Sequence, residues 1–179
     1  MYSEEMTEVF KEAFRKSVEA LKEDRKEDFY FYVFIFDEGL RPYFSAWSKE
    51  AYEKSLVEDE VAEKDKAWWK WDFADSPYCA YRHEEFFAGS DKLLAERESE
   101  MDEEYLYDHE WYTRMDSMTE ALKRLEEEGF FGIGEDRESV VINVEQAPPD
   151  GKERERAAHL NPPSDLLDEY MEICEDTED

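Results

Sequence analysis

The sequence contains few cysteines, glycines and prolines. Its two cysteines, Cys79 and Cys174, lie far apart and form no C-x-x-C pair, which excludes the disulfide framework of a small secreted domain. Glycine and proline number six each, so long loops without secondary structure are not expected. We therefore expect both thiols to be reduced, as is usual in the cytoplasm.

Long apolar runs are absent as well. No stretch approaches the roughly 20 apolar residues that a membrane-spanning helix needs. The first residues, Met1–Glu5, contain neither the basic nor the apolar part of a signal peptide. These absences predict a soluble protein of the cytoplasm.

Basic residues are scarce relative to acidic ones. The chain has 22 Lys and Arg against 51 Asp and Glu, which gives a formal net charge of −29. Nucleic acids and anionic membranes bind through cations that neutralise phosphates, so this balance argues against both partners. It favours a basic protein partner, whose approach long-range attraction accelerates. The alternative is that the charge serves only solubility.

Histidine is also rare, with His83, His109 and His159 in the whole chain. Cys79 and His83 are four residues apart and could share a helical face, but a zinc site needs at least three protein ligands. His109 and Glu110 begin the H-E-x-x-H pattern of zinc peptidases, yet position 113 is threonine. We therefore expect no bound metal and no cofactor.

The other candidates for chemistry have simpler explanations. Acidic runs such as Glu126–Glu128 are numerous, none matches a calcium-binding loop, and we interpret them as solvated helix faces. Gly129–Gly134 is rich in glycine but lacks the lysine of a phosphate-binding loop. No serine or cysteine stands in a recognisable nucleophile motif. The sequence therefore predicts a protein that is not an enzyme.

Aromatic and other apolar residues are, by contrast, abundant. Hydrophobic residues make up 41% of the chain, with 12 Phe, 11 Tyr and 5 Trp, and each large ring buries a large area. This composition excludes a disordered acidic tail. A length of 179 residues suits one hydrophobic core, so we predict a single domain over residues 1–179.

The N-terminal region is predicted to be an amphipathic helix followed by a strand. Residues 3–26 carry apolar side chains at spacings of three and four, and Ser3 can cap the helix. The aromatic and β-branched run Phe29–Phe36 predicts a strand that is covered on both faces. Four side chains of these two elements are expected to be inaccessible in one shared core: Phe10, Phe14, Phe31 and Val33.

A β-hairpin over residues 28–48 is predicted to follow from this strand. Asp37–Gly39 is the turn, in which Gly39 can take the left-handed conformation of a short hairpin. Tyr43–Trp47 is the returning strand. Because Pro42 cannot donate a hydrogen bond to a neighbouring strand, this strand starts at Pro42 or lies at the sheet edge.

The rest of the chain is predicted to be mainly helical. Gly129 is expected to end the longest of these helices as its C-cap, and Val140–Val144 is a third strand. The tail Glu175–Asp179 should fray. Helices are expected at about Lys49–Glu63, capped by Ser48, at Arg82–Glu98 and Asp102–Glu128, in a short segment ending near Leu160, and after the cap Ser164.

The predicted fold class is α+β. A small antiparallel sheet, formed by the hairpin over 28–48 and the strand Val140–Val144, packs against several amphipathic helices. The helices 3–26 and 102–128 are expected to provide most of this packing.

A cluster of tryptophans is the most distinctive local feature. Trp68, Trp69 and Trp71 cannot all lie on one side of a regular element, so some belong to the core and at least one can be exposed. An exposed tryptophan beside acidic residues suits a contact with a basic partner. The candidate partner-binding residues are Trp68, Trp69, Trp71, Asp72, Glu58, Asp59 and Glu60.

Several segments, taken in order, resemble a largely bacterial family described as domain of unknown function 4303. The resemblance implies no particular activity and supplies no catalytic residues. Families of this size and composition often accompany toxin genes as immunity proteins, which is the role that it favours. After an N-terminal amphipathic helix, the segments are Asp28–Phe34, Trp68–Asp72, Glu128–Gly132, Val140–Val144 and Ala157–Pro162.

The leading hypothesis is a non-enzymatic acidic module that binds a basic protein, as an immunity protein binds and occludes a bacterial toxin. One alternative is a DNA mimic that inhibits a nucleic-acid enzyme, which requires carboxylates spaced like phosphates on one face. The other is a hydrolase with a carboxylate site, which requires two carboxyl groups in one concave pocket with their pKa values pushed apart.

Overall fold

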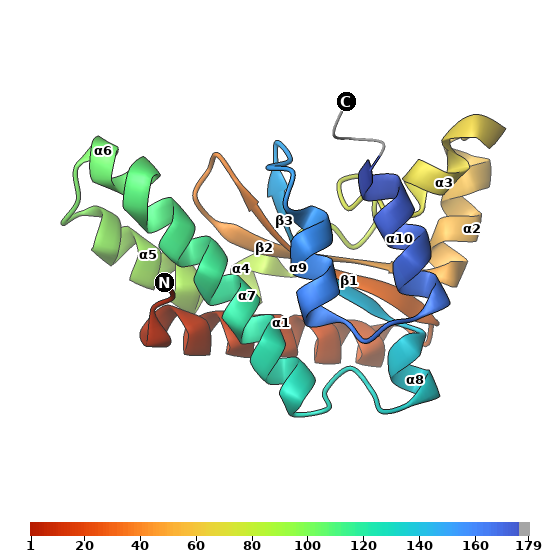
Figure 1. Cartoon of the computed structure of the whole chain (residues 1–179), viewed down its shortest axis with the longest axis horizontal. Coiled ribbons are helices and arrows are strands. Elements are labelled where there is room, and N and C mark those ends of the chain that lie inside the picture. The colour runs from red at the N-terminus through yellow and green to blue at the C-terminus, as the bar shows by residue number, and fades with distance from the viewer. Residues whose placement is uncertain (176–179) are drawn as a thin grey trace.

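The structure is a computed structural model that describes residues 1–175 (Figure 1). The first half contains α1 (Glu4–Asp24), β1 (Phe29–Asp37), β2 (Pro42–Ser48), α2 (Lys49–Glu58), the short turn η1 (Glu63–Asp65), α3 (Lys66–Trp69), α4 (His83–Phe86) and α5 (Ala88–Glu98). The second half contains α6 (Glu103–Tyr105), the π-helical segment η2 (Leu106–Glu110), α7 (Trp111–Glu127), α8 (Glu135–Glu138), β3 (Val141–Ala147), α9 (Glu153–Leu160) and α10 (Asp165–Glu175). Helices surround a three-stranded sheet, and the predicted α+β class is confirmed.

The strand order in the sheet is β2-β1-β3, with β1 in the centre. β2 pairs with β1 in the antiparallel direction, as predicted for the hairpin. β3 pairs with β1 in the parallel direction, with Phe31 opposite Val141 and Phe36 opposite Gln146, so the prediction of an antiparallel sheet is wrong for this strand. A tight turn forces antiparallel pairing, whereas the long helical connection between β2 and β3 permits either direction.

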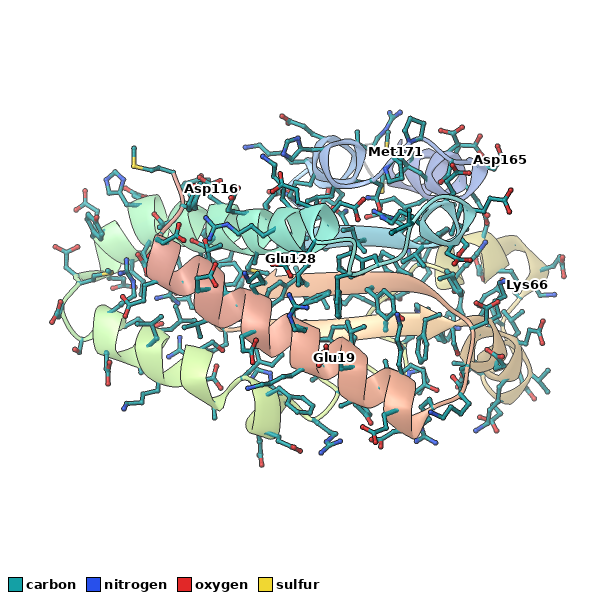
Figure 2. The ribbon with its side chains drawn as sticks, turned by 90° about the horizontal axis from the view of Figure 1, so that it is seen from below. Glu19, Lys66, Asp116, Glu128, Asp165 and Met171 are labelled. Atoms are coloured by element: carbon teal, nitrogen blue, oxygen red, sulfur yellow. The ribbon has the colours of Figure 1, made fainter. Side chains whose placement is uncertain are left out.

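The central strand β1 is covered on both faces, as its sequence predicts. Eight of its nine residues are buried. On one face, the ring of Phe34 lies 5.9 Å from that of Phe10 and 5.1 Å from that of Phe14, both in α1, and Figure 2 shows α1 crossing the sheet on this side. Phe31 points to the opposite face because side chains alternate along a strand, and its ring lies 5.3 Å from that of Trp71.

The hairpin turn differs from its prediction. Gly39 is not left-handed; Leu40 is, with φ of 58°. A Cβ atom at Gly39 would lie 2.8 Å from Oδ1 of Asp37, which accepts a hydrogen bond from the Gly39 amide, so a larger residue would displace this side chain. Pro42 begins β2 at the edge of the sheet, as predicted.

A buried ionic network holds the strained Leu40 in place. Nη1 of Arg114, a fully buried side chain, donates to the Leu40 carbonyl oxygen at 2.6 Å and to Oε1 of Glu98 at 2.9 Å. Glu110 accepts hydrogen bonds from Arg97 at 2.7 and 2.8 Å and from Arg114 at 3.3 Å. Glu110 therefore joins α5 to α7 as a buried ion-pair partner. This ionic role accounts for the glutamate of the His109-Glu110 pair.

Several helices are shorter or more interrupted than predicted. α2 ends at Glu58, where Glu60 turns left-handed with φ of 51°. The helix predicted for 82–98 is divided into α4 and α5 at Phe87, whose fully buried ring lies 5.8 Å from that of Phe34. The helix predicted for 102–128 contains the π-helical turn η2. At Phe87 the packing of one side chain, rather than the spacing of apolar residues, decides the interruption.

The helix ends agree better with prediction. Ser3, Ser48 and Ser164 cap α1, α2 and α10 through side-chain oxygens that accept from backbone amides at 3.4, 3.0 and 3.1 Å. Gly129 follows α7 with φ of 72°, as a C-cap glycine does. Of the tail Glu175–Asp179 that is predicted to fray, Glu175 is the last residue of α10, and residues 176–179 lie outside the described residues. Within residues 1–175, no helix is both long and apolar enough to cross a membrane.

Replacing Phe14 with alanine should destabilise the protein by about 3–5 kcal/mol, as core phenylalanine truncations do. Phe10, Phe14, Phe31 and Val33 are all fully buried, as predicted, and the Phe14 ring also lies 5.2 Å from that of Phe44. Chemical denaturation measures the effect. Val57→Ala, at a side chain that is 77% exposed, is the control and should change stability by less than about 0.5 kcal/mol. Equal midpoints for the two variants would contradict the packing of α1.

Candidate functional site

The segment that follows α3 runs along the outer edge of β2. Trp47 donates its indole N–H to the Asp72 carbonyl oxygen at 2.7 Å, and Ser45 donates its hydroxyl to the Phe73 carbonyl oxygen at 2.9 Å. Further along, the Ala80 amide donates to the Phe44 carbonyl oxygen at 2.8 Å. The bond from Ala80 pairs a backbone group at this edge of the sheet, and the two side-chain bonds fix the position of the residues beside Trp71.

The three clustered tryptophans have three different environments. Trp71 is 4% exposed and packs edge-to-face against Phe31 and Tyr170, with its ring 5.3 and 5.1 Å from theirs. Trp69 is half-buried and donates its indole N–H to Ser55 of α2 at 3.0 Å. Trp68 is 47% exposed. Core and surface positions both occur, as the sequence indicated.

Trp68 and Trp71 line a concave pocket, which we call the tryptophan–carboxylate pocket. Its volume is about 220 Å³. Three carboxylates reach it from three separate segments, and within residues 1–175 no Lys, Arg or His takes part in the lining. The lining residues are Trp68, Trp71, Asp72, Phe73, Glu145, Pro149, Glu153, Tyr170, Ile173 and Cys174.

A chain of hydrogen bonds positions the deepest carboxylate, that of Glu145. Asn143 and Glu145 are two residues apart on β3 and therefore lie on the same face of the sheet. The Asn143 amide donates to the Tyr170 hydroxyl at 2.6 Å, and this hydroxyl donates to Oε1 of Glu145 at 2.7 Å. Burial raises the pKa of Tyr170 well above its ordinary value, so its hydroxyl keeps the proton that it donates.

Burial also sets the protonation of the pocket. It raises the pKa of Glu145 to about 7, and the charges of Glu153 and Asp72 act in the same direction, while Tyr170 and Arg156 oppose them. Burial raises the pKa of Asp72 as well. The pKa of the Cys174 thiol rises to about 12 for the same reason, so this thiol is uncharged and is a poor nucleophile at neutral pH.

Two cations near this pocket are paired with acids. Lys70 has its Nζ 5.1 Å from the centre of the Trp71 ring and donates to Glu169 at 2.7 and 2.8 Å. The second cation is Arg156 of α9, and one of its partners, Glu153, lines the pocket. Its guanidinium donates to Asp150 at 2.8 and 2.9 Å and to Glu153 at 3.4 Å. Nε of Arg156 donates to the Val144 carbonyl oxygen at 2.6 Å. The positive charge is thus directed towards β3 and Asp150, and the pocket keeps an excess of negative charge.

The structure does not bring all the predicted partner-binding residues together. Trp68, Trp71 and Asp72 meet in the tryptophan–carboxylate pocket, whereas Trp69 packs on α2. Glu58 and Asp59 line a different cavity of about 320 Å³. Glu60 is exposed at the end of α2 and lines neither of the two. Their role in partner binding stays a prediction.

Among the ionisable residues of the pocket, sequence reasoning did not select four: Glu145, Glu153, Tyr170 and Cys174. Glu145 carried the one available signal, because it directly follows the predicted strand Val140–Val144 and is acidic at the end of a buried run. Glu153 and Tyr170 follow ordinary helix patterns and carried no signal. Within residues 1–175, no three or more His, Cys, Asp and Glu side chains are grouped so that they could hold a metal ion.

Replacing Glu145 with glutamine should stabilise the protein more at high pH than at low pH. Glu145 has a folded pKa of about 7 against an ordinary value of 4.5. Below the ordinary value the carboxyl is protonated in both states and costs nothing. Between about pH 4.5 and 7 the carboxyl ionises in the unfolded state but stays protonated in the folded state, so stability falls over this range and levels off above pH 7. The shift corresponds to about 3 kcal/mol.

The measurement is urea unfolding of both proteins at about pH 5 and about pH 8. The stability difference between Glu145→Gln and the parent should grow with pH by up to that amount. Glu104→Gln, at an exposed carboxylate of α6, is the control and should show a constant difference. A constant difference for Glu145→Gln too would show that Glu145 is already ionised at about pH 5.

Comparison with known proteins gives one match. The model of the family described as Domain of unknown function (DUF4303) matches residues 10–162. Searches of curated proteins and of solved structures find no match. The matched range contains β1, the tryptophan cluster and β3, and so most of the pocket. Because the match extends over most of the sequence, this chain belongs to the DUF4303 family.

Proposed function

We propose that the protein is a non-enzymatic acidic module that binds a basic protein, and that it acts as an immunity protein neutralising a bacterial toxin in the cytoplasm. The observation that carries this proposal is the exposed Trp68 at a pocket with three carboxylates and, within residues 1–175, no basic lining residue. A large exposed ring next to acidic groups is what a basic partner can use as an anchor.

The mechanism is occlusion of the partner's cationic surface. The net charge of −29 attracts a basic protein over the Debye length of about 8 Å at physiological salt. Once the two proteins touch, Trp68 and the pocket provide short-range contacts that slow dissociation. Cationic residues that the toxin needs for its own substrate would then be covered.

The size of the pocket supports binding of a side chain rather than of a substrate molecule. Pockets for small-molecule ligands typically have volumes of about 300–1,000 Å³, and this pocket has about 220 Å³. The Cys174 thiol, with its pKa raised to about 12, is not an activated nucleophile.

A second candidate function is a hydrolase with a carboxylate site. The observation in its favour is that Asp72 and Glu145 share one concave pocket and that burial raises the pKa of Glu145 to about 7, which suits a general acid or base. An enzyme would inactivate a partner or substrate catalytically, whereas an immunity protein acts in a one-to-one complex. The amount of protein needed for full neutralisation distinguishes the two.

The partner, recovered from the native host by pull-down and identified by mass spectrometry, should be basic and should associate more slowly as salt increases. Surface-plasmon kinetics across a salt series measures this, and the association rate should fall far more than the dissociation rate changes. An acidic partner, or an association rate independent of salt, would show that the charge serves only solubility.

Trp68→Ala should weaken the same complex by at least about tenfold, mainly through faster dissociation. The matched control is Tyr112→Ala, because Tyr112 is also exposed, at 59%, and lies in α7. Figure 2 shows Asp116 of α7 and Lys66 of α3 toward opposite ends of the molecule. If both variants bind like the parent, the anchor is not at the pocket.

A further inference from the structure

The tryptophan–carboxylate pocket offers hydrogen-bond acceptors from three directions. Asp72 follows α3, Glu145 lies on β3 and Glu153 begins α9. The carboxylates already accept hydrogen bonds from the protein: Asp72 from the Ala74 amide at 2.9 Å, Glu145 from the Tyr170 hydroxyl at 2.7 Å, and Glu153 from the Asp150 amide at 3.0 Å and from Arg156 at 3.4 Å. Two oxygens per carboxylate leave capacity for further donors. A ligand must therefore bring several donors and a positive charge.

The walls of the pocket are aromatic and aliphatic. These walls are formed by the side chains of Trp68, Trp71, Phe73, Tyr170 and Ile173. Such walls favour a cation that is weakly hydrated and that can lie against aromatic rings. The volume of about 220 Å³ corresponds to about seven water molecules at liquid density, which is room for one long side chain.

A second observation, independent of the carboxylates, also indicates a ligand. Trp71 is more than nine-tenths buried and lines the pocket, and within residues 1–175 its indole N–H has no hydrogen-bond partner. A buried donor without an acceptor destabilises the folded protein. A carbonyl oxygen of a bound peptide unit would satisfy it after a small rotation of the indole, because the nitrogen is covered in this structure.

We infer that the tryptophan–carboxylate pocket binds one arginine side chain of the basic partner, with the guanidinium among Asp72, Glu145 and Glu153 and the aliphatic stem along the tryptophans. This inference rests on the proposed function, because it names the group of the partner that the pocket takes. The class of ligand is an alkylguanidinium that belongs to a peptide chain.

Arginine suits this pocket better than lysine for three reasons. Its guanidinium has five N–H donors in one plane, which can serve several carboxylates at once. It is less strongly hydrated than an ammonium group, so the apolar walls penalise its entry less. It also stacks on aromatic faces. The lysine ammonium group, by contrast, carries its three N–H donors on one nitrogen atom.

Titration of N-acetyl-arginine methylamide into the ¹⁵N-labelled full chain tests the inference without the partner. The indole N–H signals of Trp68 and Trp71 should shift in a saturable manner. The corresponding lysine derivative should bind at least about tenfold more weakly, and the citrulline derivative, which keeps the shape but lacks the charge, at least about a hundredfold more weakly.

Asp72→Asn should reduce the affinity for the arginine derivative at least about tenfold. This variant keeps Oδ1, so the hydrogen bond from the Ala74 amide and the local turn are preserved. Glu104→Gln, on α6 and absent from the pocket lining, removes the same unit of charge elsewhere. It should leave the affinity unchanged within about twofold.

Equal affinities for the arginine, lysine and citrulline derivatives would overturn the inference, and so would an unchanged affinity in Asp72→Asn. Free agmatine binding more than about tenfold more tightly than the peptide-like derivative would also overturn it, because the pocket would then serve a free small molecule. If no derivative binds but Trp68→Ala weakens the partner complex, the inference fails and the proposed function stands. If the arginine derivative binds but the partner is acidic, the proposed function fails instead.

Discussion

The fold depends on one strand that must be kept from water on both faces. β1 consists almost entirely of aromatic and β-branched residues, and eight of its nine residues are buried. α1 covers the face that contains Phe34, while Trp71 and Tyr170 cover the face that contains Phe31. At roughly 1.5–3 kcal/mol for each large side chain, this burial is the main stabilising contribution around which the other elements are arranged.

The pocket follows from the second of these layers. Trp71 is fixed above Phe31 because Tyr30, Ser45 and Trp47 bind the backbone carbonyl oxygens of residues 70, 73 and 72. This connection carries Asp72 towards the C-terminal part of β3, where Glu145 lies. The same packing that completes the core therefore brings carboxylates from distant segments into one recess.

The distribution of charge reinforces this arrangement. Basic residues are scarce, and several of them are used inside the protein: Arg114 is fully buried, Arg137 is 4% exposed, and the half-buried Arg97 pairs with Glu110. Cations that hold α5, α7 and α8 in place cannot neutralise acids at the surface. The exposed surface is thus left strongly acidic, and the pocket beside Trp68 lies in that environment.

The sequence by itself determined the fold class, the helix caps, the hairpin and the double burial of β1, because each follows from the spacing of apolar side chains and from local hydrogen bonds. Only the tertiary structure decided the parallel direction of β3, the left-handed Leu40 and the grouping of Trp71 with Glu145. These features depend on contacts between residues far apart in the chain. Local spacing does not encode such contacts, and a carboxylate that enters a pocket has the same sequence pattern as one in solvent.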